Sequence, residues 1–502
     1  MAFAARQGLA GGVLPEHRYS ALGDRQAQIV RSGDESAALK EVEWPLRVDS
    51  LEMPPGWPSD TNDVYVTDIY WQAYCDVRAL DPTARFTVPS VLCANPKLSL
   101  AAWKEMPVNY VTVLCEGGDR QAPPPKWFLD RGYGVRVDGK AVPVRTVPSL
   151  GAKIVLELRP TAGNPRNSEG DFVWLRDGTL LFAWSLFYEA GKIDDGSWDN
   201  GGAHIACRRS HDGGRTWTKE NEILVRNTAM NVMSVSFLRL KDGRLAMFHG
   251  EKESAMVYKT MMRISEDEAK TWSAPVEVTA GLPRGRYCVN NARVVQLASG
   301  RILVPMAYHP PIPGGGVSSA ARLLCVRSDD GGKTWQAGEM CDVFDSSGRR
   351  VVSQEPGVVE LRDGRVMMWT RTDARAQYAG YSSDGGVTWG TFAPTDLMGP
   401  LSPATIKRLR NGSLVAVWND HRGHPERGNI RAPLSIAISR DEGRTWSPSV
   451  SLEENLTDFL CYTALAEVDG GILLAYCTKC RRNLDTLRLT FVPGGVLDGI
   501  GQ

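Results

Sequence analysis

One octapeptide pattern recurs five times in this 502-residue chain and restricts its fold more than any other feature. The copies have the general form Ser-x-Asp-Gly-Gly-x-Thr-Trp, and they begin at Ser210, Ser265, Ser328, Ser382 and Ser439. The aspartate suits a tight turn because its carboxylate accepts hydrogen bonds from nearby backbone N–H groups, while glycine supplies a positive φ. The Thr-Trp pair then resumes an extended strand with a large apolar anchor. Intervals of 54 to 63 residues between the copies predict a repeat architecture with one such turn per unit.

A second pattern of short apolar runs alternates with these turns. The two runs of each pair meet at a polar residue followed by glycine, and the polar residues are Asp177, Asp242, Ser299, Asp363, Asn411 and Asp469. Asp-Gly and Asn-Gly between apolar runs are strong hairpin signals. Six hairpins, each opening a four-stranded unit, predict an all-β, six-bladed β-propeller. A β-solenoid is the alternative, and the hairpin-like turns disfavour it.

The repeats divide the chain into three predicted parts. Residues 1–45 read as a polar leader that is a candidate for disorder, 46–155 as a small β-rich region, and 156–502 as the propeller. No secretory signal is recognisable at the start, which predicts a cytoplasmic location, with a secreted or periplasmic location as the alternative.

Charge, hydropathy and cysteine usage exclude several classes of function. Lys plus Arg and Asp plus Glu both number 58, so a nucleic-acid partner held by bulk positive charge is not expected. No apolar run reaches the roughly 18 residues that a membrane span needs. Cys477 and Cys480 form a CxxC pair, but no second pair completes a metal site, so we predict no metal.

Counting along the predicted strands places several reactive side chains at one end of the propeller. Antiparallel order puts the octapeptide turns at the opposite end. Residues about eight positions before a hairpin turn begin the first strand of a unit, and residues about eight positions after the turn end the second strand. Residues shortly before the third strand lie at this end too. Together these rules place six side chains there: Glu169, Asp199, Glu355, Arg371, Arg431 and Tyr462.

These residue types suit nucleophilic and acid–base chemistry on a substrate that carries a carboxylate. Glu355 beside Tyr462 can take the phenol proton, which a tyrosine must lose to act as a nucleophile at neutral pH. Asp199 can serve as a general acid where poor solvation raises its pKa, and arginine binds carboxylates through its planar fork. Each residue also has a structural alternative, namely a solvated loop for Asp199, ion pairs for Arg371, Arg431 and Glu355, and packing between blades for Tyr462.

The octapeptide resembles the Asp-box of the sialidase (neuraminidase) superfamily, and the resemblance covers about residues 160–495. The segment EPGVVELRDGRVMMWTR resembles the sialidase segment in which a catalytic glutamate precedes a carboxylate-binding arginine by about 16 residues, as Glu355 precedes Arg371. Arg431 is similar in position to the next arginine of the family's triad. Tyr462 matches the tyrosine that follows that arginine by about 30 residues.

The resemblance implies removal of a terminal sialic acid with retention of configuration through a tyrosine nucleophile. Asp199 is placed like the family's acid/base aspartate, which protonates the leaving oxygen and then activates water. The sugar's own carboxylate would repel an anionic nucleophile, whereas a neutral tyrosine approaches more easily. The implied partner is a sialylated or other acidic-sugar glycan, and no cofactor is required.

One position departs from the sialidase pattern. The family carries its first triad arginine at the start of the first inner strand, and this chain has Glu169 there. Arg166, three residues upstream, and Arg293, in the third unit, are candidates to replace it. Alternatively, Glu169 binds a hydroxyl or amine. The chain is then a glycoside hydrolase or lyase acting on a different acidic sugar, or a non-catalytic glycan-binding propeller.

Overall fold

The computed structural model describes residues 152–500, apart from 162, 190–197, 423–428, 454–458, 479–483 and 485, together with seven short strands earlier in the chain. The chain divides into two compact units, Met1–Val147 and Pro148–Gln502. In the first unit, one sheet has the order β1-β2-β4-β5 and another the order β3-β6-β7. These strands are β1 (Tyr19–Leu22), β2 (Gln26–Ile29), β3 (Ser50–Glu52), β4 (Arg85–Thr87), β5 (Thr112–Leu114), β6 (Gly134–Val137) and β7 (Lys140–Val142). The predicted leader 1–45 and β-rich region 46–155 otherwise lie largely outside the described residues.

The second unit consists of sheets that follow one another along the chain, and they are antiparallel apart from one parallel strand pair in the nine-stranded sheet. The first contains β9 (Arg166–Trp174), β10 (Leu180–Phe187), β11 (Ala203–Ser210) and β12 (Glu222–Val225). Two later sheets contain β22 (Ser353–Glu360), β23 (Val366–Thr372), β24 (Ala376–Ser382) and β25 (Ala393–Met398), and then β26 (Thr405–Arg408), β27 (Leu414–Trp418), β28 (Leu434–Ser439) and β29 (Val450–Glu453). In each of these sheets the strand order follows the chain order, so neighbouring strands are consecutive in sequence.

A nine-stranded sheet lies between the first of these sheets and the other two in the chain. Its strands are β13 (Asn231–Arg239), β14 (Leu245–Ser254), β15 (Val257–Ser265), β16 (Val276–Glu277), β17 (Arg286–Cys288), β18 (Val295–Gln296), β19 (Ile302–His309), β20 (Arg322–Ser328) and β21 (Gln336–Ala337). The short strand β17 pairs with β15 on one side and β19 on the other, and thereby joins two four-stranded groups into one sheet. The all-β prediction is confirmed, and the division into six separate blades stays a prediction.

The last sheet takes one strand from the start of the unit. Its order is β30 (Cys461–Val468), β31 (Gly471–Thr478), β32 (Thr486–Pro493) and β8 (Lys153–Leu158). Arg488 on β32 donates to Glu157 on β8 at 2.9 Å and to Glu453 at 2.5 Å, which fixes this junction by charge as well as by pairing. The beginning and end of the repeat region are therefore held together in one sheet.

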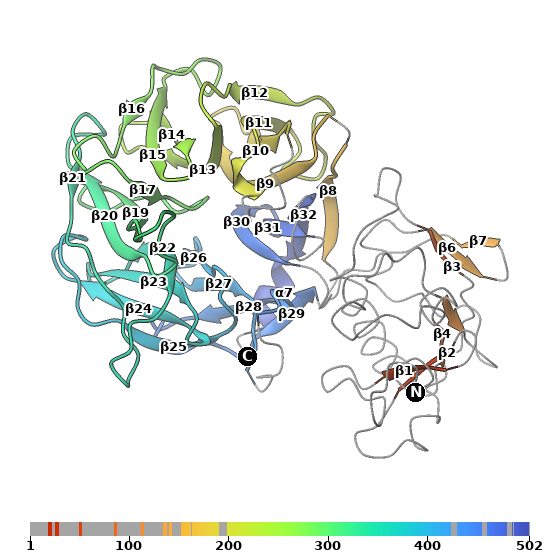
Figure 1. Ribbon diagram of the computed structural model, residues 1–502. Helices are drawn as coiled ribbons and strands as arrows, with labels where there is room; N and C mark the ends of the chain where they lie inside the picture. The colour runs from red at the N-terminus through yellow and green to blue at the C-terminus, as the bar shows by residue number, and fades with distance from the viewer. Residues whose placement is uncertain are drawn as a thin grey trace. The chain divides into compact units, whose positions relative to one another are not determined.

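The sheets stand one after another around a common centre, as Figure 1 shows. Their first strands pack together there, since β9 contacts β13 and β30, and β26 contacts β22 and β30. The apolar cores lie between successive sheets. In one of them, Leu181 and Ile205 of the first sheet cluster with Val235 and Met247 of the next. Helical structure among the described residues is limited to η4 (Trp198–Asn200) and the short helix α7 (Gly494–Gly499).

The octapeptide turns have the geometry that their sequence predicts. Asp330 Oδ1 accepts the backbone N–H groups of Lys333 and Thr334 at 2.9 Å, and Asp330 Oδ2 accepts the Thr334 hydroxyl at 2.6 Å. The copy beginning at Ser265 has Glu268 and Ala269 where others have glycine, and both keep a positive φ of 61° and 63°. Such a conformation costs a residue with a Cβ about 1 kcal/mol or more.

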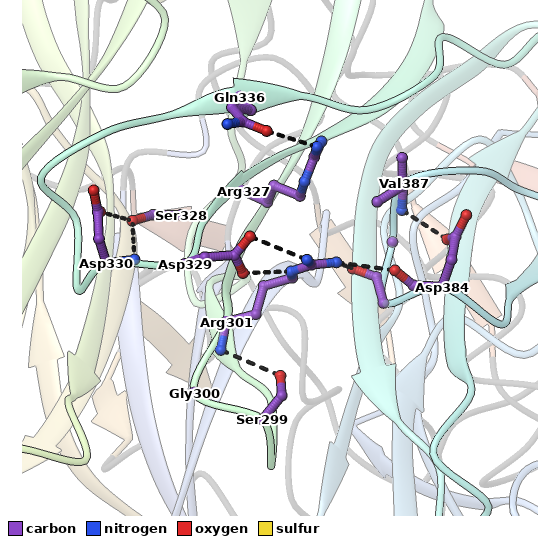
Figure 2. Close-up of polar contacts among 12 residues, drawn as sticks. Ser299, Gly300, Arg301, Arg327, Ser328, Asp329, Asp330, Gln336, Asp384 and Val387 are labelled. Carbon is purple, nitrogen blue, oxygen red and sulfur yellow. Dashed lines mark hydrogen bonds and ion pairs between the residues drawn. The ribbon is translucent and has the colours of Figure 1, made fainter.

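Neighbouring turns are tied to one another by arginine. Arg301 Nε donates to Asp329 at 2.7 Å, while its terminal nitrogen reaches the carbonyl of Asp384 in the next octapeptide at 2.9 Å (Figure 2). Among the described residues, none of those in the five turns lines the pocket described below. These turns therefore stabilise the fold at a distance from the site.

Candidate active site

The site is built on irregularities in the first strands of the sheets. Glu169, Ser234, Glu355 and Tyr462 have φ values of 50°, 60°, 51° and 58°. At each of them the register of the strand pair shifts, which marks a β-bulge. A bulge turns a side chain out of the regular alternation. These four residues are therefore directed differently from their neighbours, and all four line one pocket.

Tyr462 and Glu355 come from different sheets and meet in this pocket. The Tyr462 hydroxyl donates to Glu355 Oε1 at 3.2 Å, and Arg371 pairs with Glu355 Oε2 at 2.7 Å. Arg371 also donates to the phenol oxygen at 3.5 Å and to the side-chain oxygen of Gln354. Burial and the Glu355 charge raise the pKa of Tyr462 well above its ordinary value, so the phenol is protonated at neutral pH. The phenol therefore has a proton acceptor in place and a cation close to its oxygen.

Asp199 lies on η4 and is 44% exposed in its side chain. Its Oδ1 accepts a hydrogen bond from Arg166 at 2.7 Å, and its main-chain oxygen accepts one from Lys252 at 2.9 Å. Loss of solvent would raise the pKa of Asp199, but the charges of Arg166 and Lys252 outweigh this and lower it. Asp199 is accordingly ionised at neutral pH.

Glu169 lies in the same wall, and its pKa is shifted in the opposite direction to that of Asp199. It is 4% exposed and accepts a hydrogen bond from the Ser234 hydroxyl. Burial, followed by the charge of Asp199, raises the pKa of Glu169 to about 8, against the lowering effect of Arg166. Near pH 7 the pair of carboxyl groups therefore holds one proton, and that proton is on Glu169.

The three other predicted substrate-binding arginines do not belong to the pocket wall. Arg431 lies behind Tyr462, with its guanidinium 5.7 Å from the centre of that ring, and donates to Cys461 Sγ at 3.4 Å. Arg293 is 3% exposed and stacks on Trp369 at 5.5 Å, and burial lowers its pKa to about 10. Arg166 is directed to Asp199.

The structure thus brings five of the eight predicted residues together in a pocket of about 170 Å³. These five are Glu169, Asp199, Glu355, Arg371 and Tyr462. Their geometry agrees with the predicted chemistry, while their individual catalytic roles stay predictions. Neither Arg166 nor Arg293 takes the place of the missing triad arginine in the pocket wall.

Sequence reasoning missed several residues of the wall, including Lys252, Arg286, Cys288 and His309. Lys252 and His309 lie at or near the ends of the second strands of their units, nine residues after Gly243 and Gly300. Arg371 lies seven residues after Gly364, so the count that placed it at the rim falls two residues short of Lys252 and His309. Arg286 and Cys288 lie on β17, a three-residue strand in a connection that carries no periodic signal.

The described residues include no cluster of three or more His, Cys, Asp or Glu side chains arranged to bind a metal ion. Cys480 lies outside the described residues. No helix in the described part of the chain combines the length and apolar character of a membrane span.

Comparison with known families places these observations in context. Residues 178–474 match the model of the BNR repeat-like domain. A sialidase of Micromonospora viridifaciens is 26% identical over 310 residues, which cover 54% of this chain and 44% of that protein. A sialidase of Bacteroides fragilis is 27% identical over 228 residues, which cover 41% of this chain and 40% of the relative. The chain therefore spans less than half the length of these two relatives.

Solved structures show the same fold. A leech intramolecular trans-sialidase superposes with a TM-score of 0.53 at 15% identity, covering 78% of this chain and 77% of that one. At this identity the likeness establishes the fold alone.

Proposed function

The chain belongs to the family of BNR repeat-like domains, and from that premise we propose that it is a sialidase-type exo-glycosidase. The substrate would be a glycan that ends in sialic acid or a related acidic sugar. The observation that carries the proposal is the contact of Tyr462 with Glu355 and Arg371 in one pocket. We further infer that the sheets form six blades, with β17 bridging the second and third.

The proposed reaction begins with attack by Tyr462 on the anomeric carbon. As the C–O bond to the phenol forms, Glu355 accepts the phenol proton, which supplies the base that the raised pKa of Tyr462 demands. Arg371 offers positive charge to both the phenol oxygen and the carboxylate of the sugar. Water then hydrolyses the glycosyl-tyrosine, and the two inversions leave the configuration unchanged.

The leaving oxygen needs a proton, and two carboxyl groups compete for this role. Asp199 matches the position implied by the sialidase resemblance, yet Arg166 keeps it ionised. Glu169 holds the proton near pH 7. We therefore propose that these two carboxyl groups act as a unit, with Glu169 supplying the proton and Asp199 activating water.

A different acidic sugar is the second candidate substrate, and the pocket wall favours it over neutral sugars. The wall presents Arg371, Lys252 and Arg286 as cations, but Arg431 lies outside it and Glu169 occupies the place of an arginine. A sugar that carries a donor or acceptor group opposite Glu169 would fit this arrangement better than it would fit a site with three converging arginines.

The test is hydrolysis of a panel of fluorogenic glycosides by the full chain. The panel contains a sialoside, a ketodeoxynonulosonic acid glycoside and a uronide. The proposal predicts turnover of at least one acidic glycoside, with loss of about 10³-fold or more in kcat for Tyr462→Phe. Tyr381→Phe, at a partly exposed tyrosine outside the pocket wall, is the matched control and is expected to keep full activity.

The identity of the acid is tested by the leaving group. A nitrophenol leaves without protonation, whereas a sugar alcohol does not. Loss of the general acid therefore slows release of a lactose aglycone far more than release of nitrophenol. We expect this selective loss in Glu169→Gln, and finding it in Asp199→Asn instead would assign the role to Asp199. The anomer first released, followed by NMR, tests the tyrosine route, and an inverted first product would refute it.

A further inference from the structure

The pocket wall contains a second cluster of reactive side chains that the proposed hydrolysis does not use. Arg286 and Cys288 lie two residues apart on β17, so their side chains share one face of the strand. Strand β19 pairs antiparallel with β17, and its His309 is directly opposite Arg286. Cys288 is consequently a diagonal neighbour of His309 on the same face. All three side chains line the pocket.

Contacts within this cluster orient the imidazole toward the sulfur. His309 Nδ1 lies 2.8 Å from the carbonyl oxygen of Ser318, so this nitrogen carries a hydrogen and donates it. The other ring nitrogen is therefore the one available to interact with Cys288, whose pKa His309 lowers. Arg286 Nε also donates to Cys288 Sγ, at 3.5 Å. Cys288 as nucleophile, His309 as base and the Ser318 carbonyl that orients the base therefore lie next to one another.

The surrounding charge favours the thiolate. Burial would raise the pKa of Cys288, but His309 and Arg286 lower it below the ordinary value of a thiol. Lys252 on β14 and Tyr258 on β15 also face Cys288, and the lysine adds a third cation. Asp199 is the anion that faces Lys252 and Arg286.

The other described cysteines differ from Cys288 both in position and in the direction of their pKa shift. None of them lines the pocket. Burial raises the pKa of Cys207 and Cys477 to about 12 and that of Cys341 to about 11. Cys341 is the useful comparison because, like Cys288, it is only partly buried.

We propose that Cys288 is a nucleophilic modification site in the pocket wall, and that its reactant is a hydroperoxide. The thiolate attacks one oxygen of the peroxide, an S–O bond forms and the O–O bond breaks. The departing oxygen, a hydroxide for hydrogen peroxide or an alkoxide for an organic hydroperoxide, takes the proton of the His309 imidazolium and leaves as water or alcohol. The sulfur is oxidised by two electrons to a sulfenic acid while the peroxide is reduced. No other described cysteine lines the pocket to convert the product into a disulfide.

The cluster gives the reaction selectivity as well as rate. A small neutral peroxide can enter a pocket of about 170 Å³, and the cations stabilise the anionic oxygen that leaves. Cys288 and His309 are assigned no part in the proposed hydrolysis, and Arg286 only adds positive charge to the wall, so the oxidation can be measured whether or not a glycoside is cleaved.

The experiment treats the full-length protein with hydrogen peroxide in the presence of a cyclic 1,3-dione that captures sulfenic acids. Mass spectrometry of the peptides then reads each cysteine separately. We expect the Cys288 peptide to be captured at least about tenfold faster than the Cys341 peptide. Equal rates for the two peptides would overturn the proposal, and this comparison requires no variant.

Two variants test the role of the cluster. His309→Gln keeps a donor for the Ser318 carbonyl but removes the imidazolium, and we expect it to slow capture at Cys288 by at least about tenfold. Cys341→Ser is the matched control and is expected to leave capture at Cys288 unchanged. Iodoacetamide labelling of the same peptides near pH 6 provides a second readout, because the thiolate is the form that displaces iodide. An unchanged rate at Cys288 in His309→Gln would refute the pairing, whether or not the protein cleaves any glycoside.

Discussion

Glu169 makes a prediction about stability that is independent of the substrate. In the unfolded chain its carboxyl group titrates near the ordinary value of 4.5, while burial and Asp199 raise its pKa to about 8 in the folded protein. Between these two values the folded protein holds a proton that the unfolded chain has released. The free energy of unfolding therefore decreases as the pH rises from about 4.5 to about 8.

The size of the effect follows from the width of this window. Each pH unit within it changes the free energy of unfolding by about 1.4 kcal/mol. Between pH 5 and pH 8 the contribution of Glu169 therefore amounts to at most about 4 kcal/mol. Solvent screening does not reduce it much, because the residue is only 4% exposed. Glu169→Gln keeps the shape and removes the titration, so the stability of the variant relative to wild type is expected to rise steadily over this range.

The assay is equilibrium denaturation by urea at pH 5, 6.5 and 8, followed by tryptophan fluorescence and circular dichroism. Only the difference between variant and wild type is interpreted, because the other titrating groups cancel in it. Glu339→Gln, at an exposed glutamate outside the pocket wall, is the matched control. A flat difference for Glu169→Gln would show that Glu169 is ionised in the folded protein, and the proposed proton donor would be lost.

Three further substitutions test separate parts of the structure. Gly250→Ala places a Cβ against the phenol of Tyr258, which lines the pocket, so we expect a loss of about 1–3 kcal/mol in stability together with reduced turnover. A Cβ added at Gly281 meets open space, so Gly281→Ala is expected to keep both the stability and the turnover of the wild type. Equal melting temperatures for the two variants would contradict the packing argument. Asp384→Ala removes the acceptor for two backbone N–H groups of its turn, and calorimetry is expected to show a loss of about 1–2 kcal/mol. Arg371→Lys keeps the charge but loses the planar fork, and we expect KM for an acidic glycoside to rise about tenfold or more, so an unchanged KM would remove this residue from carboxylate binding.

The repeat pattern is sufficient to predict the strands, because Asp-Gly turns and the octapeptide mark local chain reversals that depend on few neighbours. It does not predict β17, since a three-residue strand is stabilised only by its partners β15 and β19. The count along the strands finds Glu355, Arg371 and Tyr462, whose positions depend on the same turns. It does not show that Arg293 and Arg431 lie behind the pocket wall, because whether a long side chain reaches a cavity depends on packing between sheets.

The bulges explain how a propeller-like arrangement can present reactive groups at its centre. Both faces of an inner strand are covered by neighbouring sheets, so regular alternation directs every side chain into one apolar core or the other. A residue with positive φ breaks this alternation, and Glu169, Ser234, Glu355 and Tyr462 adopt it although none is glycine. Each costs about 1 kcal/mol or more, and the packed sheets on either side supply the stability that maintains it. These four positions line the pocket wall, whereas the positive-φ residues Glu268, Ala269 and Glu442 belong to octapeptide turns outside it. The backbone irregularities therefore direct these four side chains toward the pocket, while Asp199, Lys252 and Arg371 line it without a positive φ.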